Sequence, residues 1–239
     1  MDNLPIFEGD TAEVDDMTSA DPDRPVVPRF TVSDRLAMLS DPGSLQAESI
    51  RALRTNLVAT HLHDRRRSLA ICAPTLGSGC SFVAANLAVS VAQVGVKTLL
   101  IDGNLRSPSL SGYFVSDAAP PGLSEALADP SRPLGSLIQQ VQPMLSVLFA
   151  GAVESRGQEL IGGSRFKELI DLCLRDYDLT IVDTPPANQF ADARRIASVL
   201  RYAVIIACRG RTYLKDVRAQ VDELDSDGVK VIGTYLNDY

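Results

Sequence analysis

Short apolar runs and longer amphipathic stretches alternate along the chain from about residue 68 onward. The apolar runs are continuous, as expected of strands covered on both faces, and they lie at 68–73, 97–102, 145–150, 179–184, 203–208 and 229–236. Helices are expected between several of these runs, at 81–94, 164–175, 191–200 and 213–224. The alternation predicts an α/β fold with a doubly wound, mostly parallel sheet, in which ligands bind beyond the carboxyl ends of the strands.

One more helix is expected before the first strand. Ser44 is a suitable N-cap after the sequence DPG, and apolar residues at helical spacing continue from there to about His61. Residues 1–40 are acidic and rich in proline and show no periodicity, so we predict a mostly disordered tail there. The pattern divides the chain into this tail and one folded domain, 41–239, whose first helix lies within 41–62.

Composition narrows the class of protein. The chain has 239 residues, enough for one large domain, and its hydrophobic content of 45% is typical of a globular protein. The net charge of −7 resides in the tail, because residues 1–24 contain eight acidic residues and one basic residue. The rest of the chain carries acids and bases in equal number, which gives no electrostatic basis for binding nucleic acid.

The four cysteines, Cys72, Cys80, Cys173 and Cys208, form no Cys-x-x-Cys pair. Their scatter is typical of reduced thiols in a cytosolic protein rather than of disulfides or a zinc site. No apolar run approaches the length of a membrane span, and the acidic N-terminus does not resemble a signal peptide. We therefore expect a cytoplasmic protein that reaches a membrane only through a partner.

The stretch CAPTLGSGCSF, residues 72–82, joins the first strand to the following helix. Gly77 and Gly79 allow the backbone to curl so that its N–H groups face inward, and the helix dipole is directed at the same point. A triphosphate is the natural ligand of such a loop, and Ser81 lies where a hydroxyl would ligate Mg²⁺. Because short glycine motifs are weak signals, a tight turn without a ligand remains the alternative for this stretch by itself.

Two carboxylates are expected beside this loop. Asp102 ends the second strand, in LLIDGNLRSP, and Asp183 ends a later one, in LTIVDTPP. The carboxyl ends of parallel strands meet at one edge of a sheet, so both should converge with Ser81. Two carboxylates and a hydroxyl around a phosphate loop are what a Mg²⁺–nucleotide site needs.

These features together resemble the bacterial tyrosine kinases, P-loop proteins that accompany membrane polysaccharide copolymerases in capsule and exopolysaccharide export. The resemblance covers about residues 42–239. It rests on SFVAANLAVSVAQVGVKTLLID after the loop, LLIDGNLR as a second Walker motif, LTIVDTPP with the following Asp192 as Walker B, and the segments GLSEAL, LFAG and GTYLN. The resemblance implies a P-loop NTPase fold of the deviant-Walker type that partition ATPases share.

The resemblance also implies roles for single residues. The nucleotide would be bound by Asn237, near the adenine ring, and by the loop residues Gly77, Ser78, Gly79, Cys80, Ser81 and Phe82. Mg²⁺ would be ligated by Ser81, Asp102 and Asp183, with Asp102 also acting in catalysis. ATP or ADP with Mg²⁺ is the cofactor implied.

The motif Glu-x-x-Arg-x-x-Arg is formed by Glu48, Arg51 and Arg54 in the first predicted helix. On a helix these side chains form a slanting charged stripe beside the apolar face. In the resembled family this motif packs subunits into a ring, so the resemblance implies a homo-oligomer. A solvated helix face is the alternative if the motif is taken alone.

The sequence departs from the family pattern at two positions that matter for chemistry. Cys80 replaces the Walker lysine, whose charge stabilises the transferring phosphoryl group, and Asn104 replaces an aspartate of the family's Asp-x-Asp pair. Losing one preorganised transition-state donor costs about 3–4 kcal/mol, or hundreds-fold in rate. Nucleotide binding is therefore expected to be weakened or lost, and little or no kinase activity is expected.

Further candidate residues are substitutes for the missing lysine charge and acceptors of a phosphoryl group. The arginines near strand ends that could stand in for the lysine are Arg54, Arg106, Arg209 and Arg211. Cys80 could instead be a redox switch, since a thiol at a helix N-terminus can have a lowered pKa. The phosphoacceptor candidates near the end of the sequence are Tyr235, which belongs to the last predicted strand, and Tyr239.

The favoured hypothesis is a catalytically degenerate member of the kinase family that regulates or scaffolds polysaccharide synthesis and export with a membrane copolymerase or adaptor. It would be cytoplasmic, peripheral at the inner membrane through that partner. One alternative is an active ATP-dependent tyrosine autokinase with a relocated cation. Another is a partition or cell-positioning ATPase, although those proteins start closer to their phosphate loop and do not need the charged helix.

Overall fold

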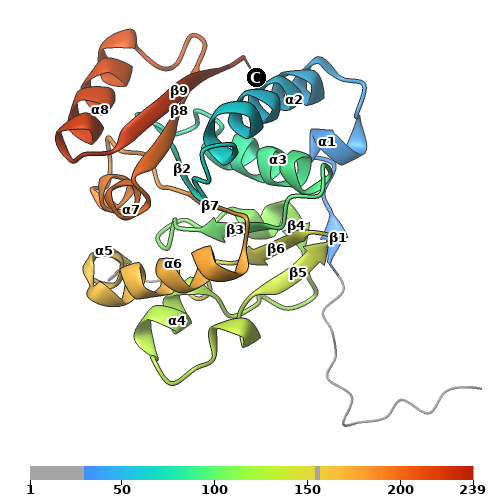
Figure 1. Cartoon of the computed structure of the whole chain (residues 1–239), viewed down its shortest axis with the longest axis vertical. Coiled ribbons are helices and arrows are strands. Elements are labelled where there is room, and N and C mark those ends of the chain that lie inside the picture. Colours follow the sequence, from blue (N-terminus) through green and yellow to red (C-terminus); the bar gives the residue numbers. More distant parts are fainter. Residues whose placement is uncertain (1–29, 154–156, 239) are drawn as a thin grey trace, which may run out of the picture.

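The computed structural model describes residues 30–153 and 157–238. The strands of its main sheet are β2 (Ser68–Cys72), β3 (Thr98–Asp102), β5 (Gln139–Gln142), β6 (Leu145–Leu148), β7 (Leu179–Asp183), β8 (Tyr202–Cys208) and β9 (Lys230–Asn237). Their order in space is β5-β6-β3-β7-β2-β8-β9, and every neighbouring pair is parallel except β5 with β6 (Figure 1). The predicted α/β fold with a mostly parallel sheet is confirmed.

Helices cover both faces of this sheet (Figure 1). One face carries α1 (Ala37–Ser40), α2 (Leu45–Leu57) and α3 (Cys80–Ala92). The other carries α4 (Leu123–Ala128), α5 (Gly157–Gly162), α6 (Ser164–Asp176), α7 (Asp192–Leu200) and α8 (Leu214–Ser226). Short helical turns are η1 (Val58–Leu62, a π-helix), η2 (Leu110–Gly112) and η3 (Leu134–Ser136).

The two helical layers explain why the strand sequences are apolar throughout. Along β2, Leu69 and Ile71 belong to the core under α2 and α3, whereas Ala70 and Cys72 belong to the core on the opposite face. Successive side chains of a strand point to opposite faces. A strand buried on both faces therefore needs an apolar residue at every position.

The first predicted helix begins and ends close to where the sequence placed it. The Ser44 side chain accepts a hydrogen bond from the Ala47 N–H at 3.2 Å, which confirms Ser44 as the N-cap. The helix continues from α2 directly into the π-helix η1. No helix in the described ranges is long and apolar enough to cross a bilayer.

The predicted tail boundary at residue 40 lies too late in the chain. Residues 1–29 are outside the described residues, but from residue 30 the chain is part of the fold. β1 (Thr31–Val32) pairs antiparallel with β4 (Phe114–Val115), and Leu36 is fully buried in the core beside α3. The sequence did not predict this segment because it is anchored by a two-residue strand and by buried side chains that form no periodic pattern.

Candidate functional site

The loop 73–79 connects β2 to α3 at the carboxyl end of a central strand. Gly77 and Gly79 have φ angles of 74° and 83°, a left-handed conformation that is strained for residues with a Cβ. Gly79 is also the N-cap of α3, whose first N–H groups have no partner within the helix. The loop and the helix start therefore present backbone N–H groups to one point, as an anion site requires.

Two side chains hold the outer surface of this loop. Arg211 Nη1 donates to the Gly77 carbonyl oxygen at 3.0 Å, and Asn237 Nδ2 donates to the Ser78 carbonyl oxygen at 3.0 Å. In a trans peptide the C=O and the next N–H point in opposite directions. The N–H groups of Ser78 and Gly79 thus face away from these donors, and within the described ranges neither forms a hydrogen bond.

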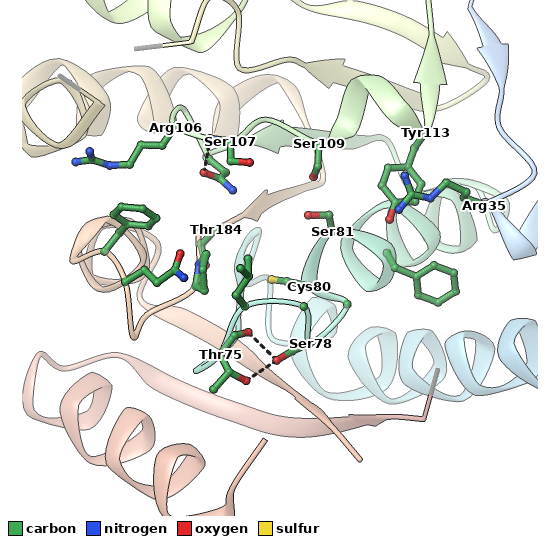
Figure 2. Close-up of a pocket in the computed structure, with 18 residues that line it drawn as sticks. Arg35, Thr75, Ser78, Cys80, Ser81, Arg106, Ser107, Ser109, Tyr113 and Thr184 are labelled. Carbon is green, nitrogen blue, oxygen red and sulfur yellow. Dashed lines mark hydrogen bonds between the residues drawn. The ribbon is translucent and has the colours of Figure 1, made fainter. Parts of the chain in front are cut away.

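A cluster of hydroxyl groups fixes the base of the loop. Thr75 Oγ1 lies 2.9 Å from Ser78 Oγ (Figure 2). It also lies 3.0 Å from Oγ1 of Thr212, a residue in the segment between β8 and α8. Ser78 Oγ also donates to the Thr75 carbonyl oxygen at 2.7 Å. The Ser78 side chain is therefore committed to the loop itself, and any contact with a nucleotide would come from its backbone N–H.

Asp102 and Asp183 lie side by side at the ends of β3 and β7, where they are partners in the sheet register. Both are buried, yet their surroundings differ. The Asp102 carboxylate accepts hydrogen bonds from the backbone N–H groups of Asn104, Ser109 and Leu110, at 3.0–3.1 Å. Neither carboxylate oxygen of Asp183 has a hydrogen-bond partner in the described part of the chain.

Burial dominates the ionisation of both groups. Desolvation is the main cause that raises the pKa of Asp183, and the neighbouring Asp102 carboxylate also raises it. The Ser81 hydroxyl, the Cys80 thiol and the Thr184 N–H act in the opposite direction, and the resulting pKa is about 7. Desolvation likewise raises the pKa of Asp102, the three backbone donors oppose that rise, and the resulting pKa is about 6. Asp183 is thus the carboxylate whose oxygens remain available to a ligand.

This arrangement fits a Mg²⁺ ion that is held jointly with a phosphate ligand. Among the described residues no cluster of three or more His, Cys, Asp and Glu side chains could hold a metal alone. Mg²⁺ typically binds one or two carboxylates and completes its shell with phosphate oxygens and water. Asp183 and the Ser81 hydroxyl could supply the protein ligands, and the ion would then neutralise phosphate charge.

A cavity of about 400 Å³ opens in front of the loop. Figure 2 shows Ser81 at its centre, with Ser107 and Ser109 on one side and Thr75 and Ser78 on the other. Cys80 and Phe82, two of the residues implied for a nucleotide site, also line it, as does Asn104, whereas Asn237 reaches only the back of the loop. The cavity therefore combines an anion-binding loop with room for a ligand, and the buried carboxylates Asp102 and Asp183 do not line it.

Comparison with known proteins connects this geometry to a family. No protein-family model matches the chain. Tyrosine-protein kinase YwqD of Bacillus subtilis is 31% identical over 200 residues, which cover 83% of this chain and 84% of the relative. The chain belongs to the bacterial tyrosine kinase family. The kinase domain of Escherichia coli tyrosine kinase ETK is similar in structure, with a TM-score of 0.80 and 31% identity over 85% of this chain and 79% of that domain.

The fold is shared more widely than the kinase family. The septum site-determining protein MinD of Pyrococcus horikoshii, solved with Mg-ADP, has a TM-score of 0.60 and 25% identity over 70% of this chain and 68% of that one. Both values and the coverage are lower than for ETK. The P-loop ATPase fold is thereby confirmed, and the similarity favours the kinases over the positioning ATPases.

Cys80 is the residue that, by the resemblance to the kinase motif, stands at the position of the Walker lysine. It lines the cavity, and its Sγ donates to the Ile71 carbonyl oxygen at 3.0 Å. Burial raises the pKa of Cys80 well above its usual value, and the Asp183 charge raises it further. This contradicts the low-pKa thiolate that a redox switch at the helix N-terminus would need.

Asn104 is the residue that, by the resemblance, replaces an aspartate of the kinase motif. Its side-chain oxygen accepts a hydrogen bond from the Ser107 N–H at 3.1 Å, while its own N–H donates to Asp102. The residue thus shapes the turn after β3 and brings no charge to the cavity.

Of the four arginines proposed as substitutes for the lysine, only Arg106 lines the cavity. Arg106 pairs with Asp192 at 3.1 Å and lies over the Phe190 ring, so its charge is already compensated. Arg54 lies near the Ser90 carbonyl oxygen on α3, and Arg209 pairs with Asp238. Arg211 donates to the outside of the loop, as described above.

Sequence reasoning missed Arg35 and Tyr113, which line the cavity from another side (Figure 2).

The charged motif of α2 is engaged within the chain. Arg51 pairs with Glu48 at 2.9 Å and donates to the Pro42 carbonyl oxygen at 2.7 Å. The three motif residues line a shallow depression on the outer side of α2. They are accessible to a neighbouring subunit, and their role in oligomerisation stays a prediction.

The two candidate phosphoacceptors differ in what the structure says of them. Tyr235 lies in β9, is 8% exposed, and its hydroxyl donates to Ser49 Oγ in α2 at 2.8 Å. A buried and hydrogen-bonded hydroxyl is not accessible to a kinase in this conformation. Tyr239 lies outside the described residues.

Proposed function

We propose that this chain is a catalytically degenerate bacterial tyrosine kinase. It would regulate or scaffold capsule or exopolysaccharide synthesis and export as a cytoplasmic subunit that joins a membrane copolymerase or adaptor. Membership of the kinase family supports the role in capsule or exopolysaccharide synthesis. The uncharged Cys80 thiol, which donates to a backbone carbonyl, is the single observation that supports the loss of kinase activity.

The missing charge is the physical reason. In P-loop enzymes the lysine follows the phosphoryl group as it moves, and it acts in a site from which water is excluded. Here the corresponding side chain is uncharged, and its thiol donates to the Ile71 carbonyl oxygen. The loss of one such donor costs about 3–4 kcal/mol in the transition state, and Asn104 removes a second charge near the acceptor.

Two further parts of the proposal rest on the family resemblance. Assembly into a ring through Glu48, Arg51 and Arg54 would be the output of the protein, and the membrane partner would control that assembly. The loop N–H groups and Asp183 persist without the lysine, so Mg²⁺ with ATP or ADP could still act as a ligand that signals occupancy rather than as a substrate.

The first test is autophosphorylation of the purified chain with Mg-ATP and its membrane partner. We expect no phosphotyrosine by mass spectrometry. Cys80→Lys, together with Asn104→Asp, should raise activity by a factor on the order of a hundred, because it restores the transition-state charge. Cys80→Met, which is of similar length but uncharged, is the matched control.

Robust phosphotyrosine in the unmodified chain would contradict the proposal. If Cys80→Lys then changed activity little, another cation would already be performing the function of the lysine. That pair of results would establish the alternative, an active autokinase.

A further inference from the structure

One cation in the cavity has no anionic partner. Arg35 lines the cavity together with Ser81 and Tyr113, and within residues 30–153 and 157–238 it forms no ion pair. Its guanidinium lies over the Tyr113 ring, with Cζ 4.7 Å from the ring centroid. Figure 2 shows Arg35 and Tyr113 on one side of Ser81 and Arg106 on the other. Since Arg106 is neutralised by Asp192, Arg35 carries the free positive charge of the site.

The backbone around Arg35 is fixed by the helix that follows the phosphate loop. Asn86, fully buried in α3, donates from Nδ2 to the Arg35 carbonyl oxygen at 3.3 Å and accepts from the Met38 N–H at 3.1 Å. On the other side, the Ser33 N–H donates to the Tyr113 carbonyl oxygen at 3.0 Å. Arg35 is thus held between α3 and the β1–β4 pair and does not lie on a free tail.

Tyr113 forms the part of the cavity wall next to Arg35. The Tyr113 residue is 3% exposed, yet it borders the cavity, and its hydroxyl forms no hydrogen bond within the described part of the chain. A guanidinium that lies over an aromatic ring keeps the N–H groups at its edge free to donate hydrogen bonds in the plane of the guanidinium. Ordering by the ring also lowers the entropy cost of binding a ligand.

We propose that Arg35 binds the phosphate groups of a nucleoside di- or triphosphate in this cavity and supplies the positive charge that α3 lacks. The guanidinium fork matches phosphate oxygens and can donate two parallel hydrogen bonds. The inference rests on the proposed function in that it names the ligand of the same site. Arg35 would contact the phosphate groups from the cavity wall and not from the loop, where the resemblance implies a lysine in the kinases.

The test compares ligand affinities of four versions of the full chain by titration calorimetry: unmodified, Arg35→Ala, Arg35→Lys and Arg218→Ala. Arg218 is an exposed arginine of α8 and serves as the matched control. ATP, ADP and adenosine are the probes, with Mg²⁺ present. We expect Arg35→Ala to weaken ATP and ADP binding about tenfold or more and to leave adenosine binding unchanged.

Ionic strength supplies a second readout. The unmodified chain should lose ATP affinity more steeply with salt than Arg35→Ala, because one ion contact fewer is screened. Arg35→Lys should retain part of the affinity, since it keeps the charge but loses the fork. Circular dichroism of each variant verifies that the fold is unchanged, as expected for an exposed side chain.

Equal ATP affinity in Arg35→Ala and Arg218→Ala would overturn the inference. So would an unmodified chain that binds neither ATP nor ADP. Neither result touches the catalytic part of the proposed function, which phosphotyrosine in the unmodified chain would contradict.

Discussion

Asp102 and Asp183 are chemically identical neighbours, and their different surroundings give them different tasks. Three backbone N–H groups consume the lone pairs of Asp102, so this side chain organises the turn that carries Asn104 and Ser109. Asp183 is left with two buried, unpaired oxygens. Buried polar oxygens without a partner are costly, and a cation bound beside Asp183 would offset that cost.

Glu125 is a carboxylate used for structure alone. Its Oε2 accepts from the Gly122 N–H at 2.7 Å and from Ser124 Oγ at 3.0 Å, and its Oε1 accepts from the Ala152 N–H at 3.0 Å. It therefore caps α4 and ties this helix to the segment after β6. Burial would raise the pKa of Glu125, but the donors from Gly122, Ala152 and Ser124 outweigh it and lower the pKa.

Glu125→Gln is expected to lower the free energy of unfolding by about 1–2 kcal/mol near neutral pH, because the amide turns an N–H group toward backbone donors. A carboxylate with a lowered folded-state pKa stabilises fully above its unfolded-state pKa, and that contribution is lost as the pH falls through the folded-state value. The difference from the unmodified chain should thus shrink as the pH falls below the ordinary titration range of a glutamate. Urea denaturation near neutral pH and at acidic pH measures it.

Glu159→Gln is the control for this prediction, because Glu159 is exposed on α5. A Glu125→Gln variant as stable as Glu159→Gln near neutral pH would show that the capping bonds do not contribute.

At the scale of elements, α2 has an apolar side that faces the core and a charged side that faces outward. Its inner side packs through Ala47, Ile50 and Leu57 against the core. Its outer side carries Glu48 and Arg51, whose ion pair is partly exposed. Exposed pairs of this kind contribute only about 0–1 kcal/mol to stability, so the outer side can be altered without unfolding the chain.

Arg51→Glu is therefore expected to leave the fold intact and to reduce the oligomeric mass, because it places a second acid beside Glu48 in the proposed subunit contact. Native mass spectrometry and light scattering measure that mass. Arg218→Glu, on the outer side of α8, makes the same charge change elsewhere. If the mass of Arg51→Glu equals that of Arg218→Glu and of the unmodified chain, the ring hypothesis is wrong.

At the scale of the whole molecule, residues 30–40 join elements that are distant in the sequence. β1 pairs with β4, and Leu36 and Met38 are buried in the core. The Asn86 side chain of α3 forms hydrogen bonds with the backbone on both sides of Leu36. The segment connects the wall of the cavity to the helix that begins at the phosphate loop. Stability of the core and placement of Arg35 should depend on each other.

Leu36→Ala tests whether this segment is part of the cooperative unit. Leu36 is 0% exposed, whereas Leu45 at the start of α2 is 87% exposed. Leu36→Ala should cost about 2–5 kcal/mol of unfolding free energy through lost burial and a residual cavity. Leu45→Ala should change it by less than about 0.5 kcal/mol. Equal costs in guanidinium denaturation would mean that the segment does not contribute to the core.

The sequence by itself determined the elements with strong local signals. Continuous apolar runs identified six strands of the sheet, and Ser44 marked the start of α2 through its own capping bond. The glycines of the loop and the carboxylates at strand ends predicted the place of the site, because parallel strands end at one edge. β5 and the short helices α4 and α5 were missed, since short or polar segments carry little periodicity.

Only the tertiary structure decided which of these side chains are free to act. Asp102 proved to be satisfied by its own turn and Asp183 did not, although both end apolar strands. Arg35 entered the cavity because Thr31 pairs with Val115 and Asn86 binds the Arg35 carbonyl. Contacts between segments so distant in the sequence depend on shape and burial in the folded chain. The local residue pattern that predicts a strand or a turn does not predict such contacts.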